Sequence, residues 1–347
     1  MRKGIVVTAK PGVEDLAAKA EELGYDSFWV YDTPMVNGDP FVGLALCAKA
    51  TSRIRLGIGV TSPALRSAPA CAAALGSLNA LAPGRVICGV GTGNTARRTL
   101  GMKPTTMATL ERFTRQLQDL TAGRPTEYSE GGRTRDVRFL HVGDYVNTED
   151  PIEFVVAAFG LEAARIAGRR GAGTISFGLL DPAAWQAFAE ARTAAADEAG
   201  VRTPTTSYVM TSMHILAEGE NPHGDLARDS MGHVAMALLT FTADNPAFAE
   251  GLEPEEREAV QRLLDRRGTT ATADDRHFVL YENYLGRIYP QDRDLIVPSL
   301  VDKVGLVGTR DDLVKRVAAL EAAGIDELVL QPVLDPEREM ADFARLL

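Results

Sequence analysis

The sequence predicts an α/β fold, a single (β/α)₈ TIM barrel in which eight parallel strands alternate with helices. Three observations support this prediction. Apolar runs alternate with amphipathic stretches, about eight such units can be counted, and 347 residues suit one barrel domain. The alternation lapses only at residues 218–298, which are charged and helix-prone. We therefore expect one domain, residues 1–347, with a helical insertion at 218–298 between the seventh strand and the helix preceding the eighth.

Eight short apolar runs are the expected strands, because parallel strands covered on both faces carry continuous apolar sequence. These runs are residues 4–8, 27–31, 55–60, 86–90, 152–157, 174–177, 207–216 and 328–331. Stretches with helical spacing of their apolar residues lie between the strands. They are residues 13–23, 41–50, 69–81, 105–121, 161–170, 182–199, 310–323 and a last helix from 336. The polar stretch 124–150 is expected to cross the surface.

Composition argues against several classes of protein. The formal net charge of -10 disfavours a nucleic-acid or membrane-surface partner, since polyanions attract clustered Lys and Arg. The 3 cysteines and 5 histidines show no metal-ligand spacing, so we expect buried structural thiols and no metal site. The chain shows neither a leader-like segment nor an apolar run of about 18 residues, which predicts a cytoplasmic location.

The loop after the fourth expected strand has the chemistry of a phosphate site. Gly89, Gly91 and Gly93 alternate at the strand end, and small hydroxyl residues and two arginines follow, ending at Arg98. Glycines let phosphate oxygens approach backbone N–H groups, and arginines supply charge. The segment also matches the G-x-G-x-x-A dinucleotide pattern, but it follows the fourth strand, and Glu111 lies within a helix, which disfavours that interpretation. Glycines needed only for strand–helix packing are a further alternative.

Two other strand ends carry candidate site residues. Gly57 and Gly59 interrupt the third expected strand, which suggests a bulge against which a planar ring could lie. Asp32 directly follows the second strand, so its carboxylate is expected in the barrel mouth, where it could bond a ring N–H or transfer a proton. An equally open interpretation makes Asp32 a turn-forming residue before Thr33-Pro34.

In this order and at these strand ends, the segments resemble the bacterial luciferase-like superfamily, most closely its methylenetetrahydromethanopterin reductase-like branch. The matching segments are Tyr31-Asp32 and residues 56–63, 78–85, 89–98, 150–152, 157–160, 307–309 and 322–326. The resemblance covers most of the chain outside 218–298. Members of this superfamily are (β/α)₈ barrels that use reduced FMN or the deazaflavin coenzyme F420, so the resemblance implies one of these two cofactors.

The resemblance also implies roles for particular residues. Asp32 would be the catalytic residue at the deazaflavin ring, and a non-proline cis peptide at Gly59-Val60 would back that ring. The expected cofactor contacts, which include the loop that cradles the phosphate, are Asp32, Gly59, Val60, Thr61, Gly91, Thr92, Gly93, Asn94, Thr95, Ala96, Arg97, Arg98, Ala158 and Gly160.

The sequence departs from the family pattern at three positions, one among these contacts and two beside them. Thr33 stands where many deazaflavin members have His, Asn94 where many have Asp or Glu, and Leu161 where many have Pro. These departures indicate a different substrate, or FMN in place of F420. Only one of Arg97 and Arg98 is expected to bind an anion, because adjacent side chains diverge.

The resulting hypothesis is an oxidoreductase that transfers a hydride between coenzyme F420 and a small organic substrate. An FMNH₂-dependent monooxygenase is the alternative within the superfamily, and a non-catalytic flavin-binding barrel is the alternative from another class. A homodimer is expected.

The insertion is predicted to be either a lid over the barrel mouth or a subdomain that supports a dimer. Its segment 281–289 contains three tyrosines, whose apolar faces and polar tips suit ligand pockets and interfaces. We expect part of this segment at the barrel mouth, over the cofactor or along a dimer contact. The alternative is a tyrosine-rich loop packed on its own subdomain.

Overall fold

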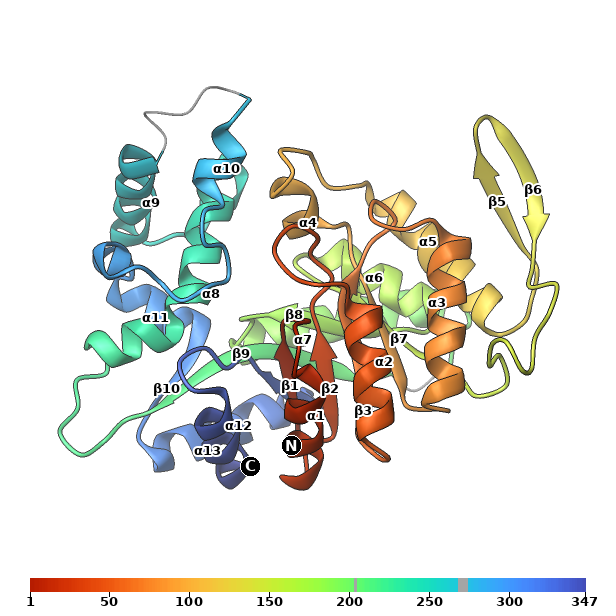
Figure 1. Ribbon diagram of the computed structural model, residues 1–347. Coiled ribbons are helices and arrows are strands. Elements are labelled where there is room, and N and C mark those ends of the chain that lie inside the picture. The colour runs from red at the N-terminus through yellow and green to blue at the C-terminus, as the bar shows by residue number, and fades with distance from the viewer. Residues whose placement is uncertain (203–204, 268–273) are drawn as a thin grey trace.

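The computed structural model describes residues 1–202, 205–267 and 274–347, and its centre is a closed barrel of parallel strands (Figure 1). Each strand pairs with the next along the chain, and the last pairs with the first. The barrel strands are β1 (Arg2–Val7), β2 (Ser27–Val30), β3 (Arg55–Thr61), β4 (Val86–Val90), β7 (Glu153–Ala157), β8 (Gly173–Phe177), β9 (Ser207–Ile215) and β11 (Glu327–Leu330). The predicted fold class and all eight predicted strands are confirmed.

The barrel interior is a packed core, because side chains from alternate strand positions fill it. The buried side chains of this interior cluster are Val6, Trp29, Ile87, Val155, Ile175, Tyr208, Met210 and Val329. The rings of Trp29 and Tyr208 meet edge to face, with centroids 5.1 Å apart. A Cβ atom at Gly57 would lie 2.3 Å from the Trp29 ring, so this glycine is required by the packing of a bulky neighbour on the adjacent strand.

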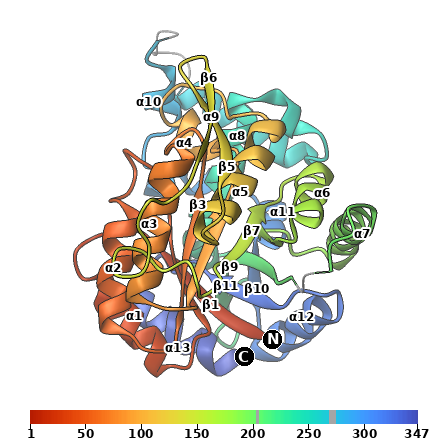
Figure 2. The ribbon, with the colours of Figure 1, turned by 90° about the vertical axis from the view of Figure 1, so that its right-hand side faces the viewer.

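Helices surround the barrel and cover the outer faces of its strands (Figure 2). They are α1 (Val13–Glu22), α2 (Pro40–Ala50), α3 (Ala68–Leu81), α5 (Met107–Thr121), α6 (Leu161–Arg170), α7 (Pro182–Glu198), α12 (Arg310–Ala322) and α13 (Pro336–Leu346). All eight were predicted, and several begin where a side chain caps the first turn: Asp39, Ser67 and Thr309 each accept a hydrogen bond from a backbone N–H. Cys47, Cys71 and Cys88 are buried free thiols, as expected.

Three kinds of element escaped the sequence prediction. The short helix α4 (Asn94–Arg98) lies inside the glycine-rich loop, and β10 (Gly305–Gly308) pairs with the second half of β9. The surface stretch 124–150 contains an antiparallel hairpin of β5 (Thr126–Glu130) and β6 (Arg133–Val137), which projects from the body of the molecule (Figure 1). Its strands are largely exposed, so they lack the apolar sequence by which the barrel strands were predicted.

The regular secondary structure of the insertion's described residues is helical, and the insertion has its own apolar core. It contains α8 (Asp225–Asp244), η1 (Pro246–Ala249), α9 (Pro254–Arg267), α10 (Arg276–Leu280) and η2 (Pro290–Leu295), and α11 (Pro298–Val304) packs on the same core. Residues 268–273 of the predicted insertion lie outside the described residues. Within the described part of the chain, no helix is both long enough and apolar enough to cross a membrane.

Candidate active site at the barrel mouth

A pocket lies at the C-terminal ends of the barrel strands, where the sequence placed the site. Its empty space, counted together with the part that is open to solvent, is about 820 Å³. The barrel strands β2, β3, β4, β7, β8 and β9 or the loops after them contribute one side, and the insertion contributes the other. The lining residues are Tyr31, Asp32, Thr33, Gly59, Val60, Gly91, Thr92, Gly93, Asn94, Thr95, Ala96, Ala157, Phe159, Ile175, Ser176, Phe177, Met210, Phe241, Tyr284 and Leu285.

Most of the predicted site residues meet in this one pocket. Asp32, the Gly59-Val60 pair and the whole segment from Gly91 to Ala96 line it. The other predicted residues do not: Thr61, Arg97, Arg98, Ala158 and Gly160. Thr61 and Ala158 are buried just behind the lining, whereas a Cβ atom at Gly160 would meet no described atom within 4 Å, so the fold itself does not require glycine there.

Asp32 is buried at the end of β2 and faces a single guanidinium. Its side chain is 3% exposed, and its Oδ2 lies 3.5 Å from Arg66 Nε. The same Arg66 donates a 2.7 Å hydrogen bond from Nη2 to Asp39. Burial raises the pKa of the Asp32 carboxyl, and a hydrogen bond from the Thr61 hydroxyl and the positive charge of Arg66 oppose this rise. Asp32 can therefore hold or release a proton closer to neutrality than an exposed aspartate. Sequence analysis missed Arg66, whose only signal was a basic residue in the loop after β3.

Strand β3 is irregular where it borders the pocket. Its register against β4 shifts between Ile58 and Thr61, and the peptide bond Gly59-Val60 is cis, which confirms both the predicted bulge and the predicted cis bond. The glycines of β4 also have a packing reason, because a Cβ atom at Gly89 would lie 2.4 Å from the Ile58 carbonyl oxygen. The bulge therefore sits tightly against β4 and presents backbone to the pocket.

The two arginines of the glycine-rich loop are engaged by protein groups. Arg98 donates from Nε to Asn94 Oδ1 at 2.7 Å and from Nη1 to Asp244 Oδ2 at 2.5 Å. Arg97 donates to the backbone carbonyl of Lys103 at 3.2 Å. Neither side chain lines the pocket, so the expected anion contact through one of them stays a prediction. Arg98 instead ties the loop to the end of α8.

The insertion closes one side of the mouth with aromatic residues. Tyr284 lines the pocket, and its hydroxyl lies 3.2 Å from Thr95 Oγ1 in the glycine-rich loop. Tyr281 donates to Asp244, the aspartate that also holds Arg98. Tyr284 and Leu285 thus lie at the barrel mouth, as predicted for part of segment 281–289, while Tyr281 and Tyr284 also belong to the insertion's own apolar core, as the alternative had it. The contact with a cofactor or a second subunit stays a prediction. Phe241 of α8 also lines the pocket, and no sequence signal distinguished it from the other apolar residues of that helix.

Buried polar atoms near this end of the barrel that have no hydrogen-bond partner among the described residues include Ser176 Oγ and Gln331 Nε2. Buried polar groups are nearly always paired, so unpaired ones beside a pocket suit a ligand with hydrogen-bonding edges. Val60, Ile175 and Met210 supply apolar surface in the same pocket. A planar ring with apolar faces and polar edges, such as a flavin or deazaflavin, fits this combination.

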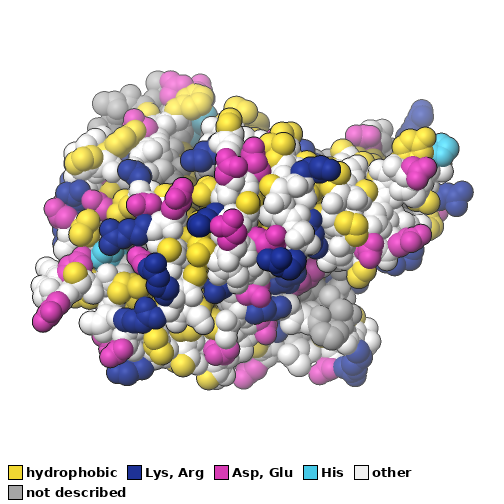
Figure 3. Space-filling model, turned by 60° about the horizontal axis from the view of Figure 1, so that its bottom comes forward, with side chains coloured by type: hydrophobic (Ala, Val, Ile, Leu, Met, Phe, Trp, Pro, Cys, Tyr) yellow, Lys and Arg dark blue, Asp and Glu magenta, His cyan; other side chains and the backbone are white. Residues whose placement is uncertain are grey.

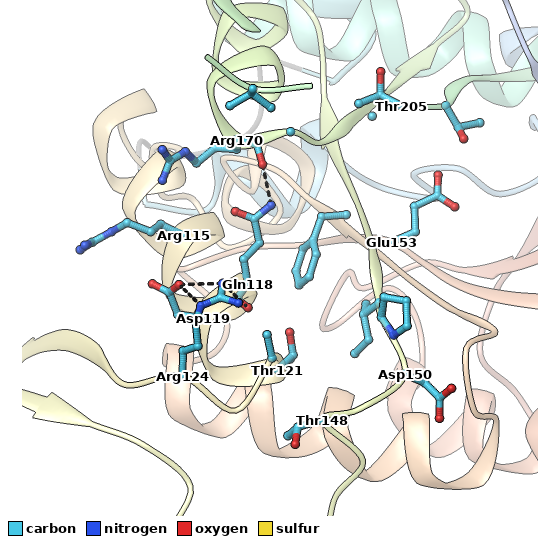
Figure 4. Close-up of a pocket in the computed structure, with 18 of the residues that line it drawn as sticks. Arg115, Gln118, Asp119, Thr121, Arg124, Thr148, Asp150, Glu153, Arg170 and Thr205 are labelled. Atoms are coloured by element: carbon cyan, nitrogen blue, oxygen red, sulfur yellow. Dashed lines mark hydrogen bonds and ion pairs between the residues drawn. The ribbon is translucent and has the colours of Figure 1, made fainter. Parts of the chain in front are cut away.

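A larger hollow of about 1650 Å³ lies at the opposite end of the strands, between α5, α6 and the starts of β7 and β8 (Figure 4). Its polar groups are largely paired with each other: Arg124 with Asp119 at 3.0 Å, and Gln118 Nε2 with the Arg170 carbonyl oxygen at 2.8 Å. The size of a hollow alone therefore does not identify the site.

Basic and acidic side chains are interspersed over the face of the molecule in Figure 3, which shows no broad basic patch for a polyanion.

Comparisons with known proteins identify the family of this chain. The family described as luciferase-like monooxygenase matches residues 8–327. The F420-dependent glucose-6-phosphate dehydrogenase of Kineococcus radiotolerans is 37% identical over 177 residues, 48% of this chain and 52% of that protein. Limonene 1,2-monooxygenase of Rhodococcus erythropolis is 26% identical over 246 residues, 68% of this chain and 62% of that protein. The chain thus spans about half the length of the dehydrogenase that it matches.

Solved structures share the fold over the whole chain. The coenzyme F420 dependent tetrahydromethanopterin reductase from Methanopyrus kandleri superposes with a TM-score of 0.71 at 19% identity, covering 100% of this chain and 98% of that one. An F420-dependent secondary alcohol dehydrogenase in complex with an F420-acetone adduct gives 0.67 at 15% identity, with coverage of 100% and 98%. At such low identity these similarities establish the fold.

Proposed function

The chain belongs to the luciferase-like monooxygenase family, and we propose that it is an oxidoreductase that transfers a hydride between coenzyme F420 and a small organic substrate. One observation carries this proposal: Asp32, the cis Gly59-Val60 peptide and the loop from Gly91 to Ala96 line the same pocket. These are the residues to which the resemblance assigns the deazaflavin site. The F420-dependent dehydrogenase relatives support the same cofactor.

Different residues of the pocket would bind different parts of the cofactor. The bulge at Gly59-Val60 would support the ring, and the backbone of the loop from Gly91 to Ala96 would hold the cofactor's phosphate side chain. When bound, the deazaflavin supplies the carbon that takes or gives the hydride. Asp32 would hold a proton at its carboxylate beside the ring, and the aromatic side chains of the mouth would exclude water.

A monooxygenase that uses reduced FMN is the second candidate. Two observations favour it: limonene 1,2-monooxygenase matches 68% of this chain, and Thr33 stands beside Asp32 where the deazaflavin branch often has His.

Separate titrations of the purified protein with F420 and FMN, followed by cofactor fluorescence, distinguish the candidates. We expect F420 to bind at least about tenfold more tightly than FMN, which corresponds to about 1.4 kcal/mol. A clear preference for FMN would overturn the proposed cofactor. Binding of F420 without turnover across a broad panel of substrates would instead favour a binding protein.

A homodimer and a cytoplasmic location remain predictions. The exposed Val42 and Leu46 of α2, at 65% and 45% exposure, give the dimer some support, because exposed apolar side chains on one helix suit a protein interface. Sedimentation equilibrium of the purified chain tests the predicted dimer.

A further inference from the structure

Most of the pocket lining outside the proposed cofactor contacts is apolar. Phe159, Phe177, Phe241 and Leu285 line it from three directions: the loop after β7, the end of β8, and the insertion. Phe159 is 60% exposed, which is unusual for a large apolar side chain and leaves its ring available to a ligand at the mouth. A ligand beside these side chains would bury mostly apolar surface.

The lining contains no free positive charge. Among its described residues there is no Lys, Arg or His, and Asp32 is the only carboxylate. The nearby Arg66 and Arg98 pair with aspartate carboxylates. Arg97 and Arg287, which flank lining segments, donate to backbone carbonyl oxygens. A phosphate or carboxylate buried beside these apolar side chains, away from the backbone N–H groups of the loop from Gly91 to Ala96, would lose its hydration without gaining a cation, and this is strongly unfavourable.

Hydroxyl groups interrupt the apolar wall at Tyr31, Thr33, Ser176 and Tyr284. Tyr31 bonds Gln331 and Tyr284 bonds Thr95, whereas Ser176 in β8 is 4% exposed and its Oγ has no hydrogen-bond partner among the described residues. A serine hydroxyl both donates and accepts a hydrogen bond, so it can pair with a carbonyl oxygen or with an alcohol. The pocket therefore combines a mainly apolar wall with a buried hydroxyl that no described residue pairs.

We propose that the substrate is an uncharged, largely apolar alcohol or carbonyl compound, and that its oxygen hydrogen-bonds to Ser176 Oγ. This inference rests on the proposed function, because an alcohol and a carbonyl compound are the two sides of one hydride transfer. The alcohol loses its carbon-bound hydrogen, with the electron pair, to the deazaflavin, and its hydroxyl hydrogen leaves as a proton to a base or water. The relatives named for glucose 6-phosphate would differ from this chain in their need for a phosphate site.

Calorimetric titrations of the full chain test the proposal with cyclohexanone and 2-octanone as uncharged probes and glucose 6-phosphate as the anion, each with and without saturating F420. We expect the ketones to bind and glucose 6-phosphate not to bind. The variant Ser176→Ala should weaken ketone binding about tenfold, the loss of one hydrogen bond to a buried group. Ser230→Ala is the matched control, since it removes a buried hydroxyl outside the pocket lining that pairs with His214.

The outcomes separate the two proposals. Equal ketone affinity in Ser176→Ala and the wild type, or tighter binding of glucose 6-phosphate than of either ketone, would overturn the substrate assignment. Failure of F420 to bind, with ketone binding that still depends on Ser176, would overturn the cofactor while supporting the pocket's substrate class. Absence of binding for all probes would overturn the substrate class.

Discussion

At the N-terminal end of the barrel, Arg55 donates hydrogen bonds to Glu153, Tyr208 and Glu327, at 2.8, 2.9 and 2.7 Å. At the C-terminal mouth, the buried hydroxyl of Ser176 has no partner among the described residues. Both ends bury polar groups, but the mouth leaves a buried hydroxyl in its pocket wall unpaired. In such barrels the N-terminal end serves stability and the C-terminal end serves binding. The comparison therefore predicts that changes at the first end reduce stability and changes at the second reduce ligand affinity.

The largest effect is expected for Arg55→Met. The change leaves Glu327, whose side chain is fully buried, without its strongest positive partner, and unpairing a buried charge costs about 3–5 kcal/mol. Urea denaturation at pH 7 measures this loss, while the F420 dissociation constant should stay unchanged. Arg2→Met is the matched control, because Arg2 is 40% exposed and lies 3.7 Å from the same glutamate. A loss of unfolding free energy below about 1 kcal/mol in Arg55→Met would contradict the assignment of the N-terminal end to stability.

The pH dependence of stability also tests the role of the N-terminal end of the barrel in stability. Burial raises the pKa of Glu327 to about 7, against the opposing charge of Arg55. Because the folded-state pKa lies above the unfolded value, the contribution of Glu327 to stability is full below about pH 4.5 and is lost as pH rises through 7. Glu327→Gln should remove this loss, so that the variant gains roughly 2–3 kcal/mol relative to the wild type between pH 4.5 and 8. A constant difference across that range would contradict the assignment.

At the mouth, Asp32→Asn should reduce F420 affinity and leave the stability of the fold unchanged. We expect F420 affinity to fall at least about tenfold, since a charged hydrogen bond contributes about 1.5–3 kcal/mol. Stability at pH 7 should not fall, because burial raises the pKa of this carboxyl and disfavours its charged form. Fluorescence titration and urea denaturation measure the two effects. Asp39→Asn, which changes the exposed partner of Arg66, should leave affinity nearly intact. Equal affinity losses in both variants would show that Arg66, rather than Asp32, carries the effect.

The smallest effect is expected where the insertion touches the glycine-rich loop. Tyr284→Phe removes only the hydroxyl that lies 3.2 Å from Thr95 Oγ1, so we expect F420 dissociation to accelerate about two- to fivefold, the value of one neutral hydrogen bond. Stopped-flow displacement of F420 measures the rate. Tyr289→Phe is the control, because Tyr289 does not line the mouth. Identical rates in the two variants would mean that the insertion does not hold the cofactor loop.

The sequence predicted those parts of the molecule whose signal is local. Eight apolar runs gave eight strands, and Asp32, Gly59-Val60 and the glycine-rich loop followed strand ends that meet at one edge of the barrel. Features that depend on distant partners were not predictable. Arg98 pairs with Asp244, which is 146 positions away, so the sequence of the loop could not show that Arg98 binds the insertion.

The same limit applies to the glycines. The sequence analysis explained Gly57 by a bulge. In the structure, Gly57 must lack a side chain because the Trp29 ring on the neighbouring strand occupies that space. A sequence pattern shows that a glycine is present, and only the packed structure shows which neighbour excludes a larger residue.

Strand β9 has two partners in succession: its first half pairs with β11, which closes the barrel, and its second half pairs with β10. Leu216, just before the insertion, donates a 3.0 Å backbone hydrogen bond to Gly308, at the end of the strand β10 that follows the insertion and α11. The chain thus leaves and re-enters the barrel at neighbouring points, so joining those points costs little loop entropy. A short linker in place of the intervening residues would leave the barrel strands in register. A different insertion joined at the same two points would change which molecules can reach the cofactor.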